Sequence, residues 1–384
     1  MARVWLLLAG LAAALTLVVA GCGSDDDEGD AAGTGAAATT SGEPQELDKV
    51  SLQLKWVTQA QFAGYYAALE EGYYEDEGLD VELKPGGPDI TPEQVVASGQ
   101  AEFGIDWLPA LLAARDQGGD LVNIAQVFSK SGMTEVTWKD SGITDVAGMK
   151  GKKVGVWCCG NENELYAALV KNGMDPKSKD DVTIVNQPFD MNLFLSRDVD
   201  AAAAMTYNEL AQVLETENPE TGELYQLDDL NVISMEEAGT AMLEDGIFVQ
   251  GSWIADEANQ DIAKRFLKAS FRGWVFCRDN PDPCLQHVLD SGPTLGEGHQ
   301  TWQLNEINAL TWPNETGIGV MEETAFQRTA DIAKQFAVIK QDASSDAYRT
   351  DLAEAAVKEL EDDGVDVNGA DWTKETVEVT PGGE

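Results

Sequence analysis

Residues 51–83 read SLQLKWVTQAQFAGYYAALEEGYYEDEGLDVEL, and this stretch decides the fold class. Its first six residues alternate between polar and apolar side chains, which predicts a strand. Residues 61–71 (QFAGYYAALEE) predict a helix with small and aromatic residues on its faces. Glycines end this helix, and residues 79–83 (LDVEL) return as a second strand. This succession of strand, helix and strand indicates an α/β architecture with a largely parallel sheet.

The alternation of strands and helices continues outward from this stretch. In the first part of the chain we expect a helix at 92–96, a strand at 102–105, a helix at 107–115 and a strand at 122–127. A second α/β unit starts near Ser141, with expected strands at 153–157, 182–185 and 201–205 and expected helices at 162–172 and 208–215. The chain crosses back near residues 247–251 (IFVQG), and the sequence beyond is mostly helical.

A lobe that is interrupted by a second lobe and followed by a helical return predicts a two-lobed clamshell. We expect lobe one at 49–140 plus 247–340, lobe two at 141–246, and a C-terminal helix with an acidic tail at 341–384. The crossings near residues 140 and 247 would be the hinges. A ligand of such a protein binds in the crevice where loops at the strand ends converge.

The first 22 residues have the layout of a secretory signal. One charge, Arg3, precedes an apolar run at residues 5–20, and small residues stand directly before Cys22. This arrangement resembles a bacterial lipobox, which implies removal of the signal peptide at 1–21 and a lipid on Cys22 that anchors the protein to a membrane. An ordinary signal peptide or a marginal anchor helix, with Cys22 incidental, is the alternative.

The segment behind this signal is acidic and lacks large apolar residues. Residues 23–46 (GSDDDEGDAAGTGAAATTSGEPQE) cannot bury enough surface to form a packed structure. We therefore expect a flexible acidic lipid tether at 22–48, and a folded body that works outside the cytoplasm.

The charge balance excludes one class of partner. The chain of 384 residues has 68 Asp and Glu against 25 Lys and Arg, a formal net charge of −43. These acids are dispersed along the chain, so we expect an acidic surface that repels nucleic acid. Hydrophobic residues make up 43% of the chain, which is enough for the cores of two domains, and we expect a monomer.

Four cysteines remain besides Cys22. Cys277 and Cys284 flank a turn-rich segment and are predicted to form a disulfide outside the cytoplasm, with two separate core residues as the alternative. Cys158 and Cys159 are adjacent, and no His or Cys pair stands at metal-ligand spacing. A strained vicinal disulfide between them is a further alternative. We expect no metal.

The sequence gives little support for catalysis. His287 and His299 are the only histidines, and neither stands in a recognisable catalytic motif. The sequence contains no nucleophile elbow, P-loop or dinucleotide fingerprint. We expect a protein that is not an enzyme and needs no cofactor.

Several motifs, in one order, carry a resemblance to a known family. They are 54–57 (LKWV), 61–66 (QFAGYY), 78–81 (GLDV), 95–105 (VVASGQAEFGI), 153–157 (KVGVW), 302–306 (WQLNE) and 317–319 (GIG). From about residue 50 to residue 340 the chain is similar to the ABC-importer solute-binding proteins that bind thiamine pyrimidine precursors, and to their riboflavin-binding relatives. The resemblance implies a type II periplasmic-binding-protein-like clamshell, each lobe a mixed, mostly parallel sheet flanked by helices. It also implies a small heteroaromatic ligand and a membrane permease as partner.

The resemblance leaves the ligand open. The motif at 61–66 and the later motifs favour a riboflavin-like ligand, with a thiamine pyrimidine precursor second and a nitrate- or sulfonate-type anion third. The family also contains a cytosolic enzyme that synthesises the thiamine pyrimidine. That enzyme has a Cys-rich loop where this chain has only Cys158 and Cys159, and the signal segment is a second departure from it.

A heteroaromatic ligand needs flat apolar walls. Trp56, Tyr65 and Trp107 follow or sit at strand ends in lobe one, and Trp157 does so in lobe two. Trp56 and Trp157 are the best candidates for stacking on the ligand, and core packing is the alternative for each. Tyr207 follows the strand at 201–205, in a loop for which the resemblance implies ligand contact.

Polar candidates stand at the same strand ends. Asp106 can accept a hydrogen bond from a ring N–H or an amine, or can cap the helix that begins at Trp107. Gln61 precedes a helix and can bond ligand or backbone. The loop after the strand at 153–157 contributes four further candidates, which are Cys158, Gly160, Asn161 and Glu162. Free N–H groups at a helix N-terminus bind acceptor groups, and a glycine allows close approach, so we expect this loop to contact the ligand.

Overall fold

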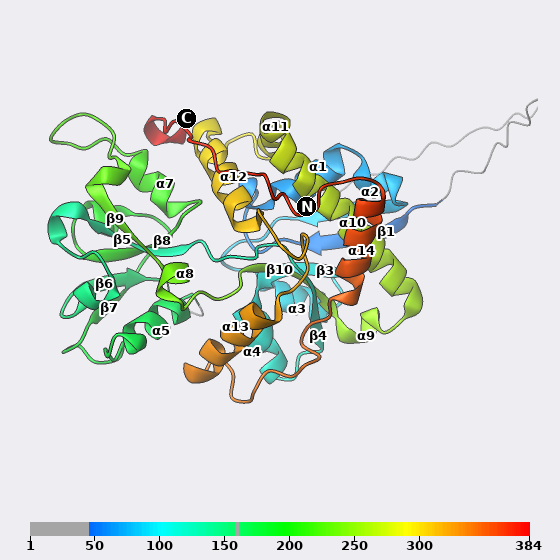
Figure 1. Ribbon diagram of the computed structural model, residues 1–384, viewed down its shortest axis with the longest axis horizontal. Helices are drawn as coiled ribbons and strands as arrows, with labels where there is room; N and C mark the ends of the chain where they lie inside the picture. Colours follow the sequence, from blue (N-terminus) through cyan, green and yellow to red (C-terminus); the bar gives the residue numbers. More distant parts are fainter. Residues whose placement is uncertain (1–45, 158–160) are drawn as a thin grey trace, which may run out of the picture. The chain divides into compact units, whose positions relative to one another are not determined.

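The computed structural model describes residues 46–157 and 161–384 (Figure 1). The predicted signal peptide at 1–21, Cys22, nearly all of the predicted tether, Cys158 and Gly160 lie outside the described residues. Within the described ranges, no helix has both the length and the apolar character that crossing a membrane requires.

The first sheet has the strand order β2-β1-β3-β10-β4. Its strands are β1 (Asp48–Gln53), β2 (Leu79–Lys84), β3 (Phe103–Trp107), β4 (Leu121–Gln126) and β10 (Asp245–Gln250). β1 pairs in parallel with β2 and β3, whereas β10 runs antiparallel between β3 and β4. The four strands that the sequence predicts in the first part of the chain therefore form one sheet, together with the strand at which the chain crosses back.

The second sheet has the order β7-β6-β8-β5-β9. Its strands are β5 (Met133–Trp138), β6 (Lys153–Val156), β7 (Thr183–Asn186), β8 (Ala201–Met205) and β9 (Leu230–Ser234). β6 pairs in parallel with β7 and β8, and β5 lies antiparallel between β8 and β9. Two five-stranded mixed sheets flanked by helices confirm the predicted two-lobed α/β fold.

The crossings between the sheets differ from the sequence expectation. β5 falls within 49–140, the range expected for lobe one, but it pairs with β8 and β9 of the second sheet. The sequence does not predict β5 as a buried strand, because Thr134, Glu135 and Thr137 are polar although all six residues of the strand are buried. The chain crosses at residues 127–132 and returns at residues 239–244, instead of near 140 and 247.

Helices surround both sheets (Figure 1). They are α1 (Ala63–Glu70), α2 (Tyr73–Asp76), α3 (Pro92–Ala97), α4 (Leu108–Asp116), α5 (Asn163–Lys171), α6 (Asn192–Leu195), α7 (Glu209–Leu214), α8 (Met235–Ala238), α9 (Gly251–Ile254), α10 (Glu257–Asp279), α11 (Pro281–Ser291), α12 (Glu297–Thr311), α13 (Glu323–Gln335) and α14 (Asp351–Asp362). Short 3-10 helices lie at Ala60–Phe62, Lys139–Ser141, Val146–Met149, Leu227–Asp229 and Pro381–Gly383. A disulfide joins Cys277 of α10 to Cys284 of α11, the pair for which the sequence predicts one.

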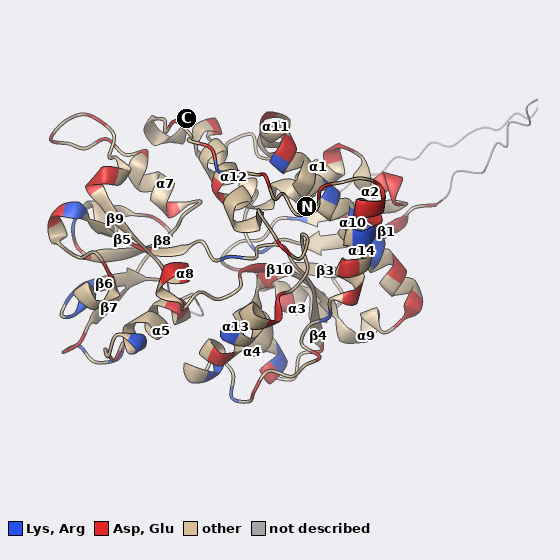
Figure 2. Ribbon diagram, in the orientation of Figure 1, with Lys and Arg blue, Asp and Glu red and all other residues tan. Residues whose placement is uncertain are grey.

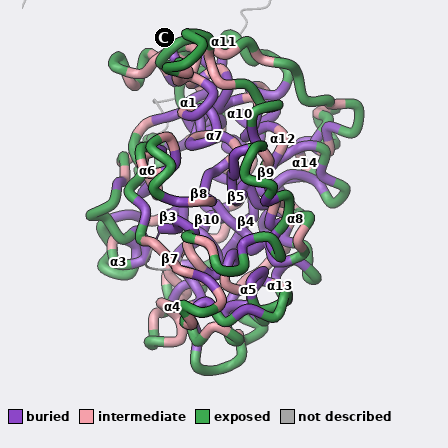
Figure 3. Tube along the Cα trace, turned by 90° about the vertical axis from the view of Figure 1, so that its left-hand side faces the viewer, coloured by how far each residue is buried: buried purple, intermediate pink, exposed green. Residues whose placement is uncertain are grey.

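The core of the first lobe depends on a close approach of α1 and α10. A Cβ atom on Gly273 would lie 2.0 Å from the carbonyl oxygen of Gly64, so only glycine fits at this contact. Trp274 beside it is fully buried, and Phe103 of β3 stacks on Phe266 of α10 with ring centroids 3.9 Å apart. Figure 3 shows that the central strands of the molecule are mostly buried, whereas exposed residues lie on its outside.

The two crossing segments are tied to each other where they leave the first sheet. Gln126, the last residue of β4, donates hydrogen bonds through Nε2 to the carbonyl oxygens of Phe128 (3.1 Å) in one segment and Glu244 (3.0 Å) in the other. A Cβ atom on Gly246 would lie 2.7 Å from Oε1 of the same Gln126. Glycine at the start of β10 therefore leaves room for this bridge.

A buried cluster of two carboxyl groups and one hydroxyl joins the crossings to lobe two. Oγ of Ser131 lies 2.8 Å from Oε1 of Glu244 and 3.0 Å from Oε2 of Glu164. The backbone N–H groups of Gly132 and Met242 donate to Glu244 (2.6 Å) and Glu164 (2.8 Å), respectively. Because the single hydroxyl proton of Ser131 serves only one carboxylate, the other carboxyl group must itself hold a proton to bond Ser131.

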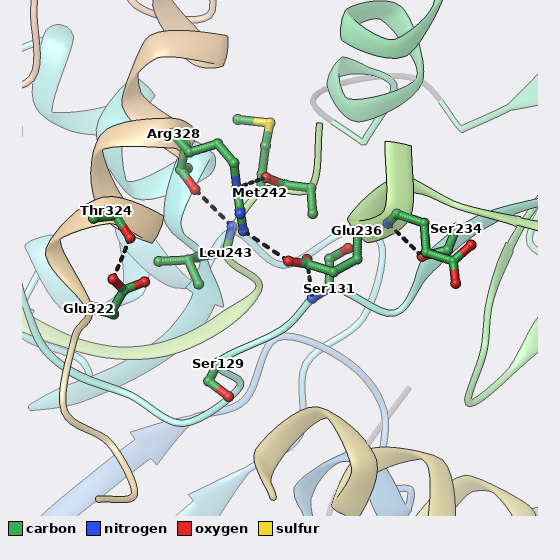
Figure 4. Close-up of polar contacts among 12 residues, drawn as sticks. Ser129, Ser131, Ser234, Glu236, Met242, Leu243, Glu322, Thr324 and Arg328 are labelled. Carbon is green, nitrogen blue, oxygen red and sulfur yellow. Dashed lines mark hydrogen bonds and ion pairs between the residues drawn. The ribbon is translucent and has the colours of Figure 1, made fainter. Parts of the chain in front are cut away.

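The returning segment also contacts α13, as Figure 4 shows. Arg328 donates through Nε to the carbonyl oxygen of Ala241 (2.8 Å) and pairs with Glu236 (3.3 Å). Oγ1 of Thr329 accepts a hydrogen bond from the N–H of Leu243 (2.9 Å). The segment is thus held by α13 on one side and by Glu164 of α5 on the other.

Burial raises the pKa of Glu164 from 4.5 to about 8, and it raises the pKa of Glu244 well above 4.5. For Glu164, hydrogen bonds from Met242 and Ser131 oppose the shift, as does the charge of Arg328, whereas the charge of Glu236 adds to it. Between pH 4.5 and about 8 the folded state therefore holds more protons than the unfolded chain. The contribution of Glu164 to stability is accordingly largest at low pH and is lost as the pH rises through this window.

We predict that Glu164→Gln flattens the pH dependence of the free energy of unfolding between pH 5 and 8. The glutamine keeps an oxygen for the Met242 N–H, and its amide donates to Ser131 without releasing a proton. Urea denaturation at several pH values measures this, and the wild-type protein is expected to lose stability with rising pH more steeply than the variant.

Glu223→Gln, in an exposed loop, is the matched control and should leave the pH dependence unchanged. Equal slopes for the wild-type protein and Glu164→Gln would show that Glu164 does not carry the extra proton.

Candidate ligand-binding site

A cavity of about 320 Å³ is lined by residues that follow strands of both sheets. Its lining consists of Lys55, Trp56, Gln59, Gln61, Trp107, Trp157, Asn161, Phe189, Met205, Tyr207, Asn208, Glu209 and Gln212. A second cavity, of about 760 Å³, shares Lys55, Trp56, Trp107, Asn161 and Phe189 with it. The two cavities therefore form one cleft between the lobes.

Aromatic side chains from both lobes meet in this cleft. Trp56 comes shortly after β1, and Trp157 comes directly after β6. Phe189, in the loop after β7, has its ring centroid 5.0 Å from that of Trp56 and 6.3 Å from that of Trp157. The Phe189 and Trp157 rings are nearly parallel, with an angle of 17° between their planes. Flat apolar walls of this kind suit a planar ligand.

The lobe-one wall carries a charged group beside the aromatic rings. The ammonium group of Lys55 pairs with Asp106 and lies 5.1 Å from the ring centroid of Trp107. Asp106 also accepts a hydrogen bond from the N–H of Trp107 (2.7 Å). Burial lowers the pKa of Lys55, but the charge of Asp106 and its hydrogen bond outweigh this effect, so the net shift is upward. Lys55 is therefore charged and already paired.

Carboxyl groups around the cleft tend to be protonated near neutral pH. Burial, with the charge of Asp106 second, raises the pKa of Glu93 to about 8. Burial also raises the pKa of Asp245 and of Glu209 to about 7. Each of these groups can therefore lie in the buried wall without a full negative charge, and a protonated carboxyl group can donate a hydrogen bond.

A chain of amide groups connects the cleft to the start of β10. Nε2 of Gln59 donates to Oε1 of Gln61 (2.6 Å), and Nε2 of Gln61 donates to Oδ2 of Asp245 (2.8 Å). On the lobe-two side, Glu209 accepts hydrogen bonds from the backbone of Met205 (3.0 Å) and from Asn208 (2.9 Å). These bonds fix the polar side chains before any ligand enters.

The charge of the described lining disfavours an anionic ligand. Among the described residues around both cavities, Lys55 is the only Lys or Arg, and it faces Asp106. Glu162 contributes a further carboxyl group, whereas the raised pKa values of Glu93 and Glu209 leave these two without a full negative charge near neutral pH. Figure 2 shows that acidic residues also lie on helices around both sheets. A neutral or cationic ligand therefore meets less electrostatic repulsion here than an anion.

Most of the residues predicted from the sequence come together in this cleft. Trp56, Gln61, Trp107, Trp157, Asn161 and Tyr207 line the smaller cavity, and Asp106 and Glu162 line the larger one. Asp106 lies within β3 instead of following it, and Glu162 directly precedes α5. Cys158 and Gly160 lie outside the described residues.

Tyr65 lines neither cavity. It is 2% exposed and packs edge-to-face against Trp274 of α10, with ring centroids 5.6 Å apart. The close contact of α1 with α10 directs this side of α1 into the core of the first lobe. Tyr65 therefore belongs to the packing of lobe one.

Several residues of the lining are not predicted from the sequence, among them Lys55, Phe189 and Glu209. Phe189 lies three residues after β7, as Trp56 does after β1, so a search for aromatic residues shortly behind strands finds it. Lys55 carries no such signal, because its pairing with Asp106 depends on a residue of another strand. Neither histidine lines either cavity. His287 contacts Glu71 (2.9 Å), whereas His299 contacts Glu215 (2.8 Å) and Asn208 (2.9 Å), a residue of the smaller cavity's lining.

Relatives of known sequence match most of the chain. A riboflavin-binding protein, RibY, of Chloroflexus aurantiacus is 25% identical over 83% of this chain and 90% of the relative. A formylaminopyrimidine-binding protein of Halalkalibacterium halodurans is 24% identical, and a 4-amino-5-hydroxymethyl-2-methylpyrimidine phosphate synthase of Aspergillus parasiticus is 26% identical. Each of these two alignments covers 65% of this chain and 72% of the relative.

The fold and the family agree with the resemblance seen in the sequence. The periplasmic aliphatic sulphonate binding protein SsuA of Escherichia coli superposes with a TM-score of 0.61 at 14% identity, over 82% of this chain and 92% of that one. The pattern described as NMT1/THI5 like matches residues 59–283, which is more than half of the chain. The chain belongs to the NMT1/THI5-like family.

Proposed function

We propose that this protein is an extracytoplasmic substrate-binding lipoprotein of an ABC importer, which captures a small heteroaromatic vitamin or vitamin precursor. One observation carries the proposal, namely that aromatic side chains of both lobes line one cavity. A planar ring that enters this cavity can stack on Trp56 from lobe one and Trp157 from lobe two. Closure of the two lobes about the crossings would then bury the ligand and present it to a membrane permease.

Riboflavin or a related flavin is the first candidate ligand, and a thiamine pyrimidine precursor is the second. Relatives named for binding riboflavin and formylaminopyrimidine support both. Both are planar, with ring nitrogens and polar substituents that the amides and protonated carboxyl groups of the cleft can bond. A nitrate- or sulfonate-type anion fits less well, because the single cation of the described lining is already paired with Asp106.

We predict that riboflavin stabilises the wild-type protein, and that Trp56→Ala and Trp157→Ala each weaken its binding by about tenfold or more through loss of a stacking face. Thermal unfolding at increasing ligand concentration measures both effects. Ligand at one hundred times its dissociation constant adds about 2.7 kcal/mol of stability. The pyrimidine precursor and sulfonate are tested in parallel.

Trp372→Ala is the matched control, because Trp372 is a partly buried tryptophan that lines neither cavity. Trp157→Phe preserves an aromatic face and guards against misfolding of the alanine variant. Unchanged affinity in both Trp56→Ala and Trp157→Ala would remove the stacking assignment. Stabilisation by sulfonate alone would replace the proposed ligand class.

The alternative function is that of a cytosolic enzyme which synthesises the thiamine pyrimidine, as named for one group of relatives. Mass analysis of the protein isolated from its native cells separates the two proposals. The lipoprotein proposal predicts a mature chain that begins at an acylated Cys22 in the membrane fraction. An unprocessed cytosolic chain that releases an aminopyrimidine on incubation with a vitamin B6 phosphate and iron would support the enzyme.

A further inference from the structure

Phe189 is exposed in a way that the fold does not require. Its side chain is 52% exposed, whereas the neighbouring Trp157 is 3% exposed. A single exposed apolar side chain is common on protein surfaces, but Phe189 is exposed at the lining of two cavities. Its position beside Trp56 and Trp157 favours a role in ligand binding.

The loop that carries Phe189 is held on both sides of the ring. Nε1 of Trp157 donates a hydrogen bond to the carbonyl oxygen of Pro188 (3.1 Å). Oδ1 of Asp190 accepts a hydrogen bond from the N–H of Asn192 (2.9 Å), which continues the loop into α6. The backbone is thus positioned while the ring of Phe189 stays accessible to a ligand.

Phe189 is one of five described residues that line both cavities, and its ring contacts Trp56 of lobe one and Trp157 of lobe two. The smaller cavity has four aromatic lining residues besides Phe189. The larger cavity is lined by Glu93 and Asp106 among others.

We propose that Phe189 determines the specificity of the cleft, as a further aromatic wall that a planar ring contacts where the lining is shared with the larger cavity. The proposal rests on the proposed function and defines its ligand class more closely. The ligand has one planar heteroaromatic ring system that contacts Phe189 beside the tryptophans. It does not enter between these rings, because their centroids already lie 5.0 Å (Trp56) and 6.3 Å (Trp157) from that of Phe189. Any polar substituent of that ring passes Phe189 and enters the larger cavity, where carboxyl groups bond hydroxyl or amino groups.

The test compares Phe189→Ala, Phe189→Leu and Phe189→Tyr, with riboflavin and 4-amino-5-hydroxymethyl-2-methylpyrimidine as probes. Phe189→Ala is expected to bind the probe about tenfold more weakly, because a contact between aromatic rings is lost. The loss should appear mainly as faster dissociation, measured by stopped-flow fluorescence. Phe189→Tyr should restore binding to within about twofold, and Phe189→Leu should not, because leucine has size but no π face.

Leu227→Ala provides the control, since Leu227 is also 52% exposed but lines neither cavity. It should leave the dissociation rate unchanged. If Phe189→Ala binds the probe as tightly as the wild-type protein does, the proposed role of Phe189 is wrong and the proposed function still stands. If Phe189→Leu binds as tightly as the wild-type protein, the aromatic character of Phe189 is not what matters. Failure of the wild-type protein to bind either probe would overturn the proposed function and, with it, this inference.

Discussion

Strand β10 lies between β3 and β4 of the first sheet, although the chain builds the whole second sheet between β4 and β10. The insertion places the two crossing segments next to each other, and Gln126 bonds the backbone of both. Gly246 is the residue that permits this bridge, because any side chain there would meet Gln126. The position of lobe two, and with it the cleft, depends on this local geometry at the end of β4.

The same few residues link the crossings to the cleft. Glu244 ends the returning segment and bonds Ser131 of the other crossing, while Asp245 begins β10 and bonds Gln61 in the cleft wall. Neighbouring carboxyl groups thus connect the crossings to the wall of the cleft. Burial raises the pKa of both groups, so protonation stabilises them without an external counter-ion. The hydrogen bonds of Glu244 and Asp245 thus come from residues of the protein itself, namely Ser131, Gly132 and Gln61.

The sequence predicts the parts of the fold whose signals are local. The alternation at 51–56 and the apolar strand at 153–157 locate β1 and β6 to within a few residues, and hence the tryptophans that follow them. It fails where burial is set by distant partners. β5 contains Glu135, a polar residue in a fully buried strand. Tyr65 faces α10 because Gly64 and Gly273 allow a close approach of the two helices, and no local sequence pattern predicts this contact. Phe189 has a local signal, since it follows β7 closely, whereas the pairing of Lys55 with Asp106 depends on the order of strands in the sheet.

We propose that the aromatic walls of the cleft hold a planar molecule without changing it chemically. A crystal structure of the mature protein grown with riboflavin tests this most directly. We expect an intact flavin with its ring stacked on Trp56 or Trp157 in the cleft between the two sheets. A flavin bound elsewhere on the protein, or a chemically altered molecule in the cleft, would contradict it.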